Sequence, residues 1–525
     1  MPFPLYRTGK RQLPAVAESN TPPLTRRDYQ LALLLFALIL TANLIRLNYW
    51  SPLPDEINYA RCARSLIDNR TPISSDIMFF PPLFVYLSAL LQLLGMELLT
   101  SVRLISALTG AAILPVLYLT ARLLYPPATA LPALLLTLPL FSLRLYSRLG
   151  QVEILMLFFI TLSFFLLLRE LQIGNGRYAL GAGVVLGLGL WTKETALGAT
   201  AVAVIFILTS YQSRWQMLGK FLLGLAPPAL LLFILSIFTG RNLLFEILAS
   251  RGYDINMLQL DLLGNLIALG ANLGYNLVPR LFYPWEILIF ILLVPAVSIL
   301  LLIALIKGVK DKNPFSRLVL IYLIIHLPFF FLFSRKFDYY LLPTALLALF
   351  NGGLTVLAAD TGRTLRRAGL CLLTLLCIDN LYSGCFLYFN RGTHASFEEA
   401  IRQIEPNTTV ATSHPTLVEY LAHRAGRQLQ VRELFEPGTY RLHSGVLADS
   451  TIGAILLKYY YYQRLNSLYP QDWERLQALF PLKMELIDYN WSTPFRHLPI
   501  KLKGIAEFAK PIGVLILKKH YRHSD

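Results

Sequence analysis

Long apolar stretches recur along this chain from Leu31 to Tyr388 and then stop. Each stretch is close to the roughly 20 residues that a helix needs to cross the hydrocarbon core of a bilayer. With 55% hydrophobic and only 15% charged residues, the sequence is also far too apolar for a water-soluble chain of 525 residues. We therefore predict an all-α polytopic membrane domain followed by a C-terminal soluble unit.

The apolar stretches can be drawn as about eleven membrane spans, because a helix pairs every backbone polar group within itself. Two of them, 178–191 and 195–210, are short, so one long bent helix would also fit that region. The expected spans are 30–47, 101–123, 128–143, 153–168, 178–191, 195–210, 217–239, 285–306, 317–333, 340–358 and 368–388.

Basic residues in the short loops indicate orientation, because Lys and Arg concentrate on the cytoplasmic side of a membrane. The basic N-terminal tail is expected inside, and the first span then serves as an anchor, since no signal-peptide cleavage site follows it. We expect a multi-pass protein of a prokaryotic inner membrane, with an endoplasmic reticulum membrane as the alternative. Counting crossings places outside everything after residue 389 and the loops 48–100, 144–152, 192–194, 240–284 and 334–339.

The chain divides by composition into a cytoplasmic tail over 1–29, a membrane domain over 30–389 and an extracytoplasmic α/β domain over 390–525. The first outer loop has the apolar spacing of two helices, one over 55–69 and one from Pro81-Pro82 to Gly95. In the C-terminal domain, Ser396 and Glu399 form a capping box for a helix to residue 404. Strands are predicted at 408–412, 429–434, 454–461, 484–489 and 512–517, and further helices at 415–424 and 472–480.

The net charge of +16 does not indicate a nucleic-acid partner, because Lys and Arg are spread through short loops instead of forming a stripe. The cysteines are too few and too apolar in setting for a disulfide framework or a zinc site. We interpret all of them as packing residues: Cys62, Cys371, Cys377 and Cys385.

Carboxylates lie at two positions of the predicted outer face. Asp55 and Glu56 follow the first span directly, and Glu153 begins the fourth. A carboxylate close to hydrocarbon is costly unless it has a partner, so a functional role is the first hypothesis. The alternative is that these residues only favour helix N-termini through the helix dipole.

Cations occur on the same predicted face, at Arg103, Arg148, Lys193 and Lys336. Each on its own is explained by long side chains that reach the membrane interface. Together they contradict the usual cytoplasmic bias of basic residues, which indicates a shared site. In such a site a carboxylate handles an acceptor hydroxyl while Lys or Arg holds a phosphate. A sugar on a lipid phosphate already has a good leaving group, so a base and several cations suffice for its transfer.

The motifs resemble those of the C-superfamily integral membrane glycosyltransferases, in the branch of protein mannosyltransferases and lipid A aminoarabinose transferases. The resemblance covers about residues 30 to 390. It rests on an ordered set of short motifs: Pro54-Asp55-Glu56 with Tyr59 and Ala60, Pro81-Pro82-Leu83, Arg103-Leu104, Arg148 to Glu153, Thr192-Lys193, and Lys336 through Tyr340 to Pro343.

The resemblance implies an inverting transfer of a sugar, a hexose or pentose, from a polyprenyl phosphate to a glycan, lipid or protein acceptor. It implies Asp55 as catalytic base with Glu56 beside it, and Tyr59 and Tyr340 in support. Glu153 would position the acceptor or a divalent cation, with Asp55 as the second metal ligand if a metal is used. Family members often have Asp at that position, so Glu153 leaves metal use open. Contacts to the carrier phosphate would come from Lys193, Lys336, Arg103 and Arg148.

Three other classes compete with this interpretation. A non-enzymatic receptor, with the C-terminal unit binding a ligand and the membrane part as its anchor, leaves the outer-face carboxylates unexplained. A lipid or glycan transporter is also polytopic, but it predicts charges near the membrane midplane and repeated halves, neither of which is visible in the sequence. A ligase for undecaprenyl-linked glycans would use a similar outer-face pocket, and the sequence discriminates poorly between the two enzymes.

Overall fold

The structure is a computed structural model that describes residues 23–70, 82–239, 294–332, 341–389, 395–436, 441–487 and 513–518. The predicted outer loops 240–284 and 334–339 and most of the N-terminal tail lie outside the described residues.

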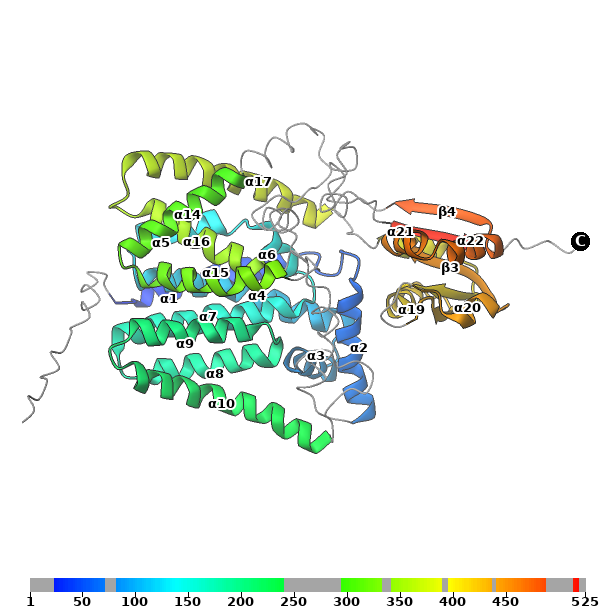
Figure 1. The fold of residues 1–525 in the computed structure, drawn as a ribbon, viewed down its shortest axis with the longest axis horizontal. Coiled ribbons are helices and arrows are strands. Elements are labelled where there is room, and N and C mark those ends of the chain that lie inside the picture. The colour runs from blue at the N-terminus through cyan, green and yellow to red at the C-terminus, as the bar shows by residue number, and fades with distance from the viewer. Residues whose placement is uncertain are drawn as a thin grey trace, which may run out of the picture.

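Roughly parallel and antiparallel helices form a bundle that contains most of the described chain (Figure 1). Ten of the predicted spans each overlap one helix within the described residues, whereas the predicted span 128–143 is divided between two helices, α5 and α6. The bundle helices are α1 (Arg26–Leu44), α4 (Leu98–Arg122), α5 (Pro127–Thr137), α6 (Phe141–Tyr146), α7 (Val152–Ile173), α8 (Arg177–Thr192), α9 (Ala196–Ser210), α10 (Arg214–Thr239), α14 (Val294–Lys310), α15 (Pro314–Leu332), α16 (Leu342–Leu357) and α17 (Arg363–Phe389).

The outer surface of the bundle is apolar, as expected where lipid replaces water. Among the described helices, α1, α4, α7 and the Arg214–Leu235 part of α10 are long and apolar enough to cross a membrane. Large side chains on α1 and α10 are exposed, with Leu33 at 68%, Leu38 at 60% and Phe238 at 81%. Such exposure would be unfavourable in water and is the normal state of a lipid-facing surface.

A short non-helical segment separates α8 from α9. Lys193 has an extended conformation, with φ −159° and ψ 136°, and α9 starts only at Ala196. The region that also fitted one long bent helix is therefore two helices. The short non-helical connection between them places Lys193 at the end of the bundle, where its side chain is buried.

Two helices of the first outer loop lie across one end of the bundle, α2 (Pro54–Asn69) and α3 (Leu83–Leu93) (Figure 1). Both follow the sequence prediction closely. Cys62 of α2 packs with Val85 of α3, as expected for a packing residue. The same prediction is wrong for Cys371, which lies on an exposed face of α17, because the surface of a membrane helix also accepts a small apolar side chain.

The C-terminal part of the chain contains a five-stranded sheet with the order β2-β1-β3-β5-β4. Strands β1, β2 and β3 are parallel, whereas β5 runs antiparallel to β3 and β4. The elements are α18 (Ala395–Arg402), β1 (Thr409–Thr412), α19 (Pro415–Arg424), β2 (Gln430–Glu433), α20 (Ser444–Ala448), β3 (Ile452–Lys458), α21 (Tyr459–Leu468), α22 (Pro470–Leu479), β4 (Leu482–Ile487) and β5 (Gly513–Lys518).

The prediction of a strand up to Tyr461 is wrong. Strand β3 ends at Lys458, and α21 begins at the next residue. Pairing with β5 ends at the same place, where Lys458 lies opposite Val514. Tyr461 instead stacks on Phe435 at a ring separation of 5.6 Å. An aromatic side chain favours a strand, but Tyr461 belongs to α21, which packs on the sheet.

This C-terminal α/β unit is docked on α2 through α19 (Figure 1). Apolar residues of α2, α3 and α4 join those of α18, α19 and the sheet in one buried cluster. Polar contacts flank the cluster: Arg61 pairs with Glu419 at 2.6 Å, and the Tyr420 hydroxyl donates to Glu97 at 2.8 Å. The unit therefore has a defined position over the end of the bundle.

Candidate active site

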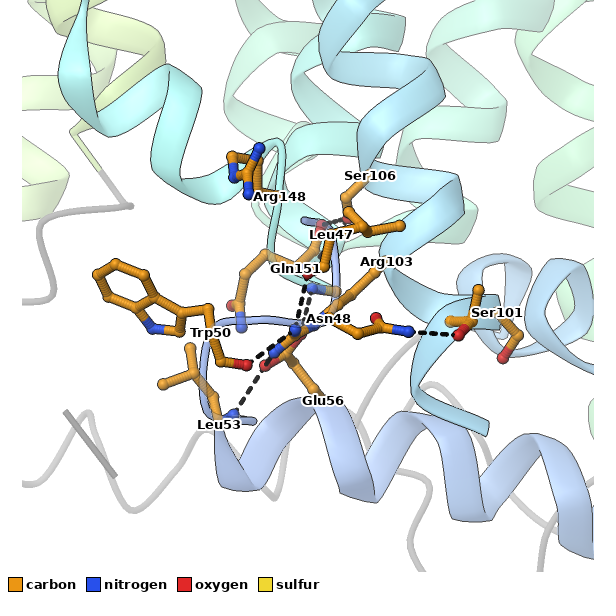
Figure 2. Close-up of polar contacts among 12 residues, drawn as sticks. Leu47, Asn48, Trp50, Leu53, Glu56, Ser101, Arg103, Ser106, Arg148 and Gln151 are labelled. Atoms are coloured by element: carbon orange, nitrogen blue, oxygen red, sulfur yellow. Dashed lines mark hydrogen bonds and ion pairs between the residues drawn. The ribbon is translucent and has the colours of Figure 1, made fainter. Parts of the chain in front are cut away.

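A buried ion pair lies at the start of α2. Arg103 of α4 donates from Nε to Glu56 Oε1 at 2.7 Å and from Nη2 to Oε2 at 3.0 Å, and both side chains are 0% exposed (Figure 2). A charge pair without water is stable only when its remaining donors and acceptors are also satisfied. Its surroundings therefore decide whether the pair is tolerable.

Backbone groups complete this pair. Glu56 accepts hydrogen bonds from the N–H of Leu53 and of Gly150, both at 2.7 Å. Arg103 Nη1 donates to the carbonyls of Leu47 and Trp50, both at 2.9 Å. The pair thus joins α2 and α4 to the segments before α2 and before α7, as the dashed lines in Figure 2 show. It fixes the direction in which α2 starts.

Arg148 ties the same segments to the end of α1. Its Nη1 donates to the carbonyls of Ala42 and Asn43, at 3.0 and 3.2 Å, and its Nη2 donates to the carbonyl of Arg46 at 3.1 Å. Carbonyls at a helix C-terminus lack partners within the helix and attract a cation. In this arrangement the guanidinium holds protein backbone.

Gly150 lets the segment before α7 pack closely against α4. A Cβ atom at this position would lie 2.6 Å from Val102 Cγ2 and 3.3 Å from its backbone carbonyl carbon. Gly150→Ala should therefore push the 150 amide away from Glu56 and cost about 1–3 kcal/mol of stability. Thermal unfolding in detergent measures the loss. Gly198→Ala in α9, where a Cβ would meet no atom within 4 Å, is the matched control and should not lower the midpoint, because Ala favours a helix over Gly. Equal midpoints for both variants would contradict the packing argument.

Asp55 directly precedes Glu56 but has a different environment. Its side chain keeps an exposed surface, whereas Glu56 is buried. Surrounding protein removes part of its hydration and raises the pKa of Asp55, and the charges of Glu153 and Glu56 act in the same direction. Lys193 and Lys458 oppose them and lower the pKa of Asp55. A raised pKa makes a carboxylate a stronger proton acceptor at neutral pH.

A second buried ion pair lies in the bundle, and the charges of both partners act on the pKa of Asp55. Glu153, in the first turn of α7, accepts a hydrogen bond from the ammonium of Lys193, and the two side chains are 3% and 2% exposed. Glu153 Oε2 has no hydrogen-bond partner among the described residues. A buried acceptor without a partner is costly in a protein at rest. This oxygen is available to a hydroxyl group or a cation brought by a ligand.

Comparisons with known proteins address the fold. The family model of dolichyl-phosphate-mannose-protein mannosyltransferases matches residues 80–238. The crystal structure of ArnT from Cupriavidus metallidurans bound to undecaprenyl phosphate is similar, with a TM-score of 0.52 and 12% identity over 93% of this chain and 97% of that chain. The Archaeoglobus fulgidus oligosaccharyltransferase in complex with Zn and sulfate has a TM-score of 0.53 and 15% identity, covering 87% of this chain and 72% of that chain. Comparison with curated proteins by sequence finds no match.

The chain has the fold of a C-superfamily membrane glycosyltransferase. It is an integral, multi-pass membrane protein. The resemblance inferred from short motifs is thereby confirmed. The predicted outer-face residues Asp55, Glu56, Arg103, Glu153 and Lys193 converge at one end of the bundle.

Some predicted site residues have surroundings that the sequence did not indicate. Tyr59 is buried, with its ring edge-on to Phe84 at 5.4 Å, in the cluster on which the C-terminal unit docks. Lys336 and Tyr340 lie outside the described residues. Sequence reasoning missed Gly150 and Lys458. Gly150 lies within the motif from Arg148 to Glu153, which was a signal, whereas nothing in the local sequence marked Lys458.

The divalent-cation hypothesis rests on Asp55 and Glu153. Within the described part of the chain, no group of three His, Cys, Asp or Glu residues is arranged to hold a metal ion. The unpartnered Oε2 of Glu153 fits one oxygen ligand, and hard divalent cations also accept ligands from water and substrate phosphate. The prediction of a metal therefore remains a hypothesis with two protein carboxylates.

Proposed function

We propose that the chain transfers a sugar from a polyprenyl-phosphate donor to an acceptor hydroxyl, with Asp55 as the general base. The observation that carries this proposal is the contrast between the two adjacent carboxylates. The hydrogen bonds of Glu56 hold α2 in place, whereas the side chain of Asp55 is exposed and its pKa is affected by the charges of the Glu153–Lys193 pair. An accessible carboxylate with a raised pKa on a rigid support is suited to accept a proton.

The proposed reaction is a single displacement. Asp55 accepts the proton of the acceptor hydroxyl as its oxygen forms a bond to the anomeric carbon of the sugar. The bond between that carbon and the carrier phosphate oxygen breaks, and the polyprenyl phosphate leaves with the electron pair. Attack from the face opposite the leaving group inverts the anomeric configuration. Cations then stabilise the developing phosphate charge.

The cations divide into two roles. We assign contact with the carrier phosphate to Lys193, which forms an ion pair with Glu153, and to Lys336. Arg103 and Arg148 make four and three hydrogen bonds to protein, respectively. This geometry favours positioning roles for the two arginines in place of the phosphate contacts expected from the sequence.

The location of the site supports an enzyme over a transporter. Its charged groups come from helix ends: the start of α2, the second turn of α4, the first turn of α7, and the end of α8. A transporter is expected to bind its substrate near the membrane midplane. A ligase of undecaprenyl-linked glycans shares the same requirements and remains the second enzymatic candidate.

We further propose that this end of the bundle faces away from the cytoplasm, with the N-terminus inside and the α/β unit outside. The basic loops at the opposite end support this orientation. The proposed boundaries are 1–29, 30–389 and 390–525. A prokaryotic inner membrane is the proposed location, and the identities of sugar and acceptor remain to be found by assay.

The direct test is an assay of purified protein in liposomes with a panel of radiolabelled polyprenyl-phosphate sugars and a crude acceptor extract. We expect one donor to lose its sugar to the acceptor fraction and to release polyprenyl phosphate. Transfer of a whole oligosaccharide from a diphosphate carrier would favour the ligase. Movement of an intact donor across the bilayer without release of phosphate would favour the transporter.

Chelation separates the two roles considered for Glu153. If Glu153 and Asp55 hold a divalent ion, a chelator should abolish transfer, and adding back Mg²⁺ or Mn²⁺ should restore it. If Glu153 positions the acceptor directly, the rate should be unchanged by the chelator, and Glu153→Gln should raise the acceptor KM. A chelator-insensitive enzyme with an unchanged acceptor KM in this variant would exclude both roles.

A further inference from the structure

Two buried glutamines near α2 and α7 use their side-chain amides differently. Gln92 of α3 donates from Nε2 to the Ala60 carbonyl at 3.0 Å and to the hydroxyls of Ser88 and Ser101 at 3.2 and 3.3 Å. Gln151, the residue before α7, is 2% exposed, yet its Nε2 has no hydrogen-bond partner among the described residues. The first amide therefore holds protein elements together, whereas the second is not used for that purpose.

The backbone of Gln151 is held firmly. Its N–H donates to Ser106 Oγ at 3.0 Å, and the same hydroxyl donates to the Gln151 carbonyl at 3.2 Å. The N–H of the preceding residue, Gly150, donates to the buried Glu56 at 2.7 Å. Figure 2 shows Gln151 beside the ion pair, and no dashed line reaches its side-chain amide. The amide is thus carried by a rigid support, which a selective contact with a ligand requires.

Two further buried polar atoms near this amide also lack a partner among the described residues. Ser51 is 1% exposed and lies in the segment before α2 that the Glu56–Arg103 pair holds, and its Oγ is one of these atoms. The other is Glu153 Oε2, two residues after Gln151. Each such atom costs free energy unless a hydrogen bond is supplied. Their occurrence on two segments of one site indicates that a polar ligand supplies these bonds.

The chemistry of the amide favours a hydroxyl group over a phosphate. A phosphate is bound most strongly by charged donors, and the amide of Gln151 is neutral. An amide nitrogen donates two hydrogen bonds, and a hydroxyl oxygen accepts one and can donate its own proton onward. A sugar carries several such hydroxyls around one ring, so it can meet the donor of Gln151 and an acceptor such as Glu153 Oε2 together.

Burial favours the sugar of the donor over the acceptor molecule. A sugar that is being transferred must be shielded from water, which would otherwise take it in place of the acceptor. Gln151 is almost fully buried, whereas the side chain of Asp55, which the proposed reaction places against the acceptor hydroxyl, is exposed. The amide therefore lies on the shielded side of the site.

We propose that Gln151 is a specificity-determining residue of the transfer site, whose side-chain amide donates a hydrogen bond to one hydroxyl of the donor sugar. This inference rests on the proposed function and narrows its substrate class to sugars that keep this hydroxyl. A sugar without it leaves the buried amide unpaired, and sites built in this way reject such analogues. The loss corresponds to about a 10- to 100-fold lower kcat/KM.

The first test uses monodeoxy analogues of the active donor with wild type, Gln151→Met and Gln92→Met. Wild type should reject one analogue by about 10- to 100-fold in kcat/KM. In Gln151→Met that rejection should fall to within about twofold, with the other analogues unaffected. Gln92→Met should keep the wild-type pattern. An unchanged pattern in folded Gln151→Met, or an effect confined to the acceptor KM, would overturn the inference.

A second test does not depend on activity, because it measures thermal unfolding of the free protein in detergent. Methionine has nearly the volume of glutamine and no buried donor to satisfy. Gln151→Met should therefore leave the midpoint equal to that of wild type or raise it. Gln92→Met removes three hydrogen bonds and should lower the midpoint. A similar fall in Gln151→Met would give its amide a structural role and contradict the inference.

Binding separates failure of this inference from failure of the proposed function. A polyprenyl-phosphate sugar that binds should raise the unfolding midpoint more than polyprenyl phosphate alone. Gln151→Met should lose the part of the rise that depends on the sugar and keep the remainder. Loss of the rise with polyprenyl phosphate alone would overturn the inference in favour of a phosphate contact. The expected loss in a protein that transfers no sugar would refute the proposed function and leave the contact intact.

Discussion

Asp55→Asn should abolish sugar transfer, with kcat lowered by about 10²–10⁴-fold, the usual contribution of a general base. The amide has the same shape as the carboxyl but does not accept the proton of the acceptor hydroxyl. Because the side chain of Asp55 is exposed and has no hydrogen bond that holds it to another described residue, the protein should remain folded. The measurement is transfer from the active donor by purified protein in liposomes, with unfolding followed in parallel.

Asp68→Asn is the matched control for this substitution. Asp68 lies on the same helix and is exposed, but it pairs only with Arg64 one turn away, at 3.0 Å. Its replacement should leave kcat unchanged. A folded Asp55→Asn protein with wild-type kcat would place the base elsewhere, and an equal loss in both variants would indicate a general effect on α2.

Arg103→Leu should destabilise the protein by about 3–5 kcal/mol, because it leaves the buried Glu56 carboxylate without its partner. The loss includes the position of α2, since Glu56 also holds the amides of Leu53 and Gly150. Activity should fall with stability, because Asp55 is carried by the first turn of α2. The midpoint of thermal unfolding in detergent and the kcat of the surviving folded fraction measure the two effects.

An exposed pair on the same helix provides the comparison. Arg64→Leu breaks the Arg64–Asp68 pair, in which both side chains are about half exposed, and should cost no more than about 0.5 kcal/mol. Adding Glu56→Gln to Arg103→Leu removes the orphaned charge and should recover part of the stability. No recovery would mean that Arg103 acts mainly through the carbonyls of Leu47 and Trp50. A rise in donor KM without loss of stability in Arg103→Leu would restore the phosphate-binding role.

The sequence predicted the membrane helices well, because a span needs only a long apolar run, and the two helices of the first outer loop followed from apolar spacing and proline. It also indicated Asp55 and Glu56 together. It did not separate their roles, because adjacent residues of a helix point about 100° apart. Glu56 turns into the bundle toward Arg103, whereas the side chain of Asp55 is exposed.

Other features depended on tertiary contacts that no local pattern encodes. A cation at a helix end has the same sequence context whether it binds a phosphate or the carbonyls of a neighbouring helix, as Arg148 does. Lys458 ends an ordinary buried strand. The effect of its charge on the pKa of Asp55 depends on the contact of the C-terminal unit with α2, which no local pattern encodes. The run of tyrosines after Lys458 favoured a strand by propensity, but the sheet offers no described partner beyond Val514.

The position of the proposed site at the end of an apolar bundle also determines how the concentrations of the two proposed substrates are expressed. A lipid-borne donor would reach Asp55 by diffusing in the plane of the membrane, whereas a water-borne acceptor would arrive from bulk solution. The donor's effective concentration is then its mole fraction among lipids. Diluting liposomes with buffer should leave the donor saturation unchanged, whereas adding inert lipid at constant donor should lower it.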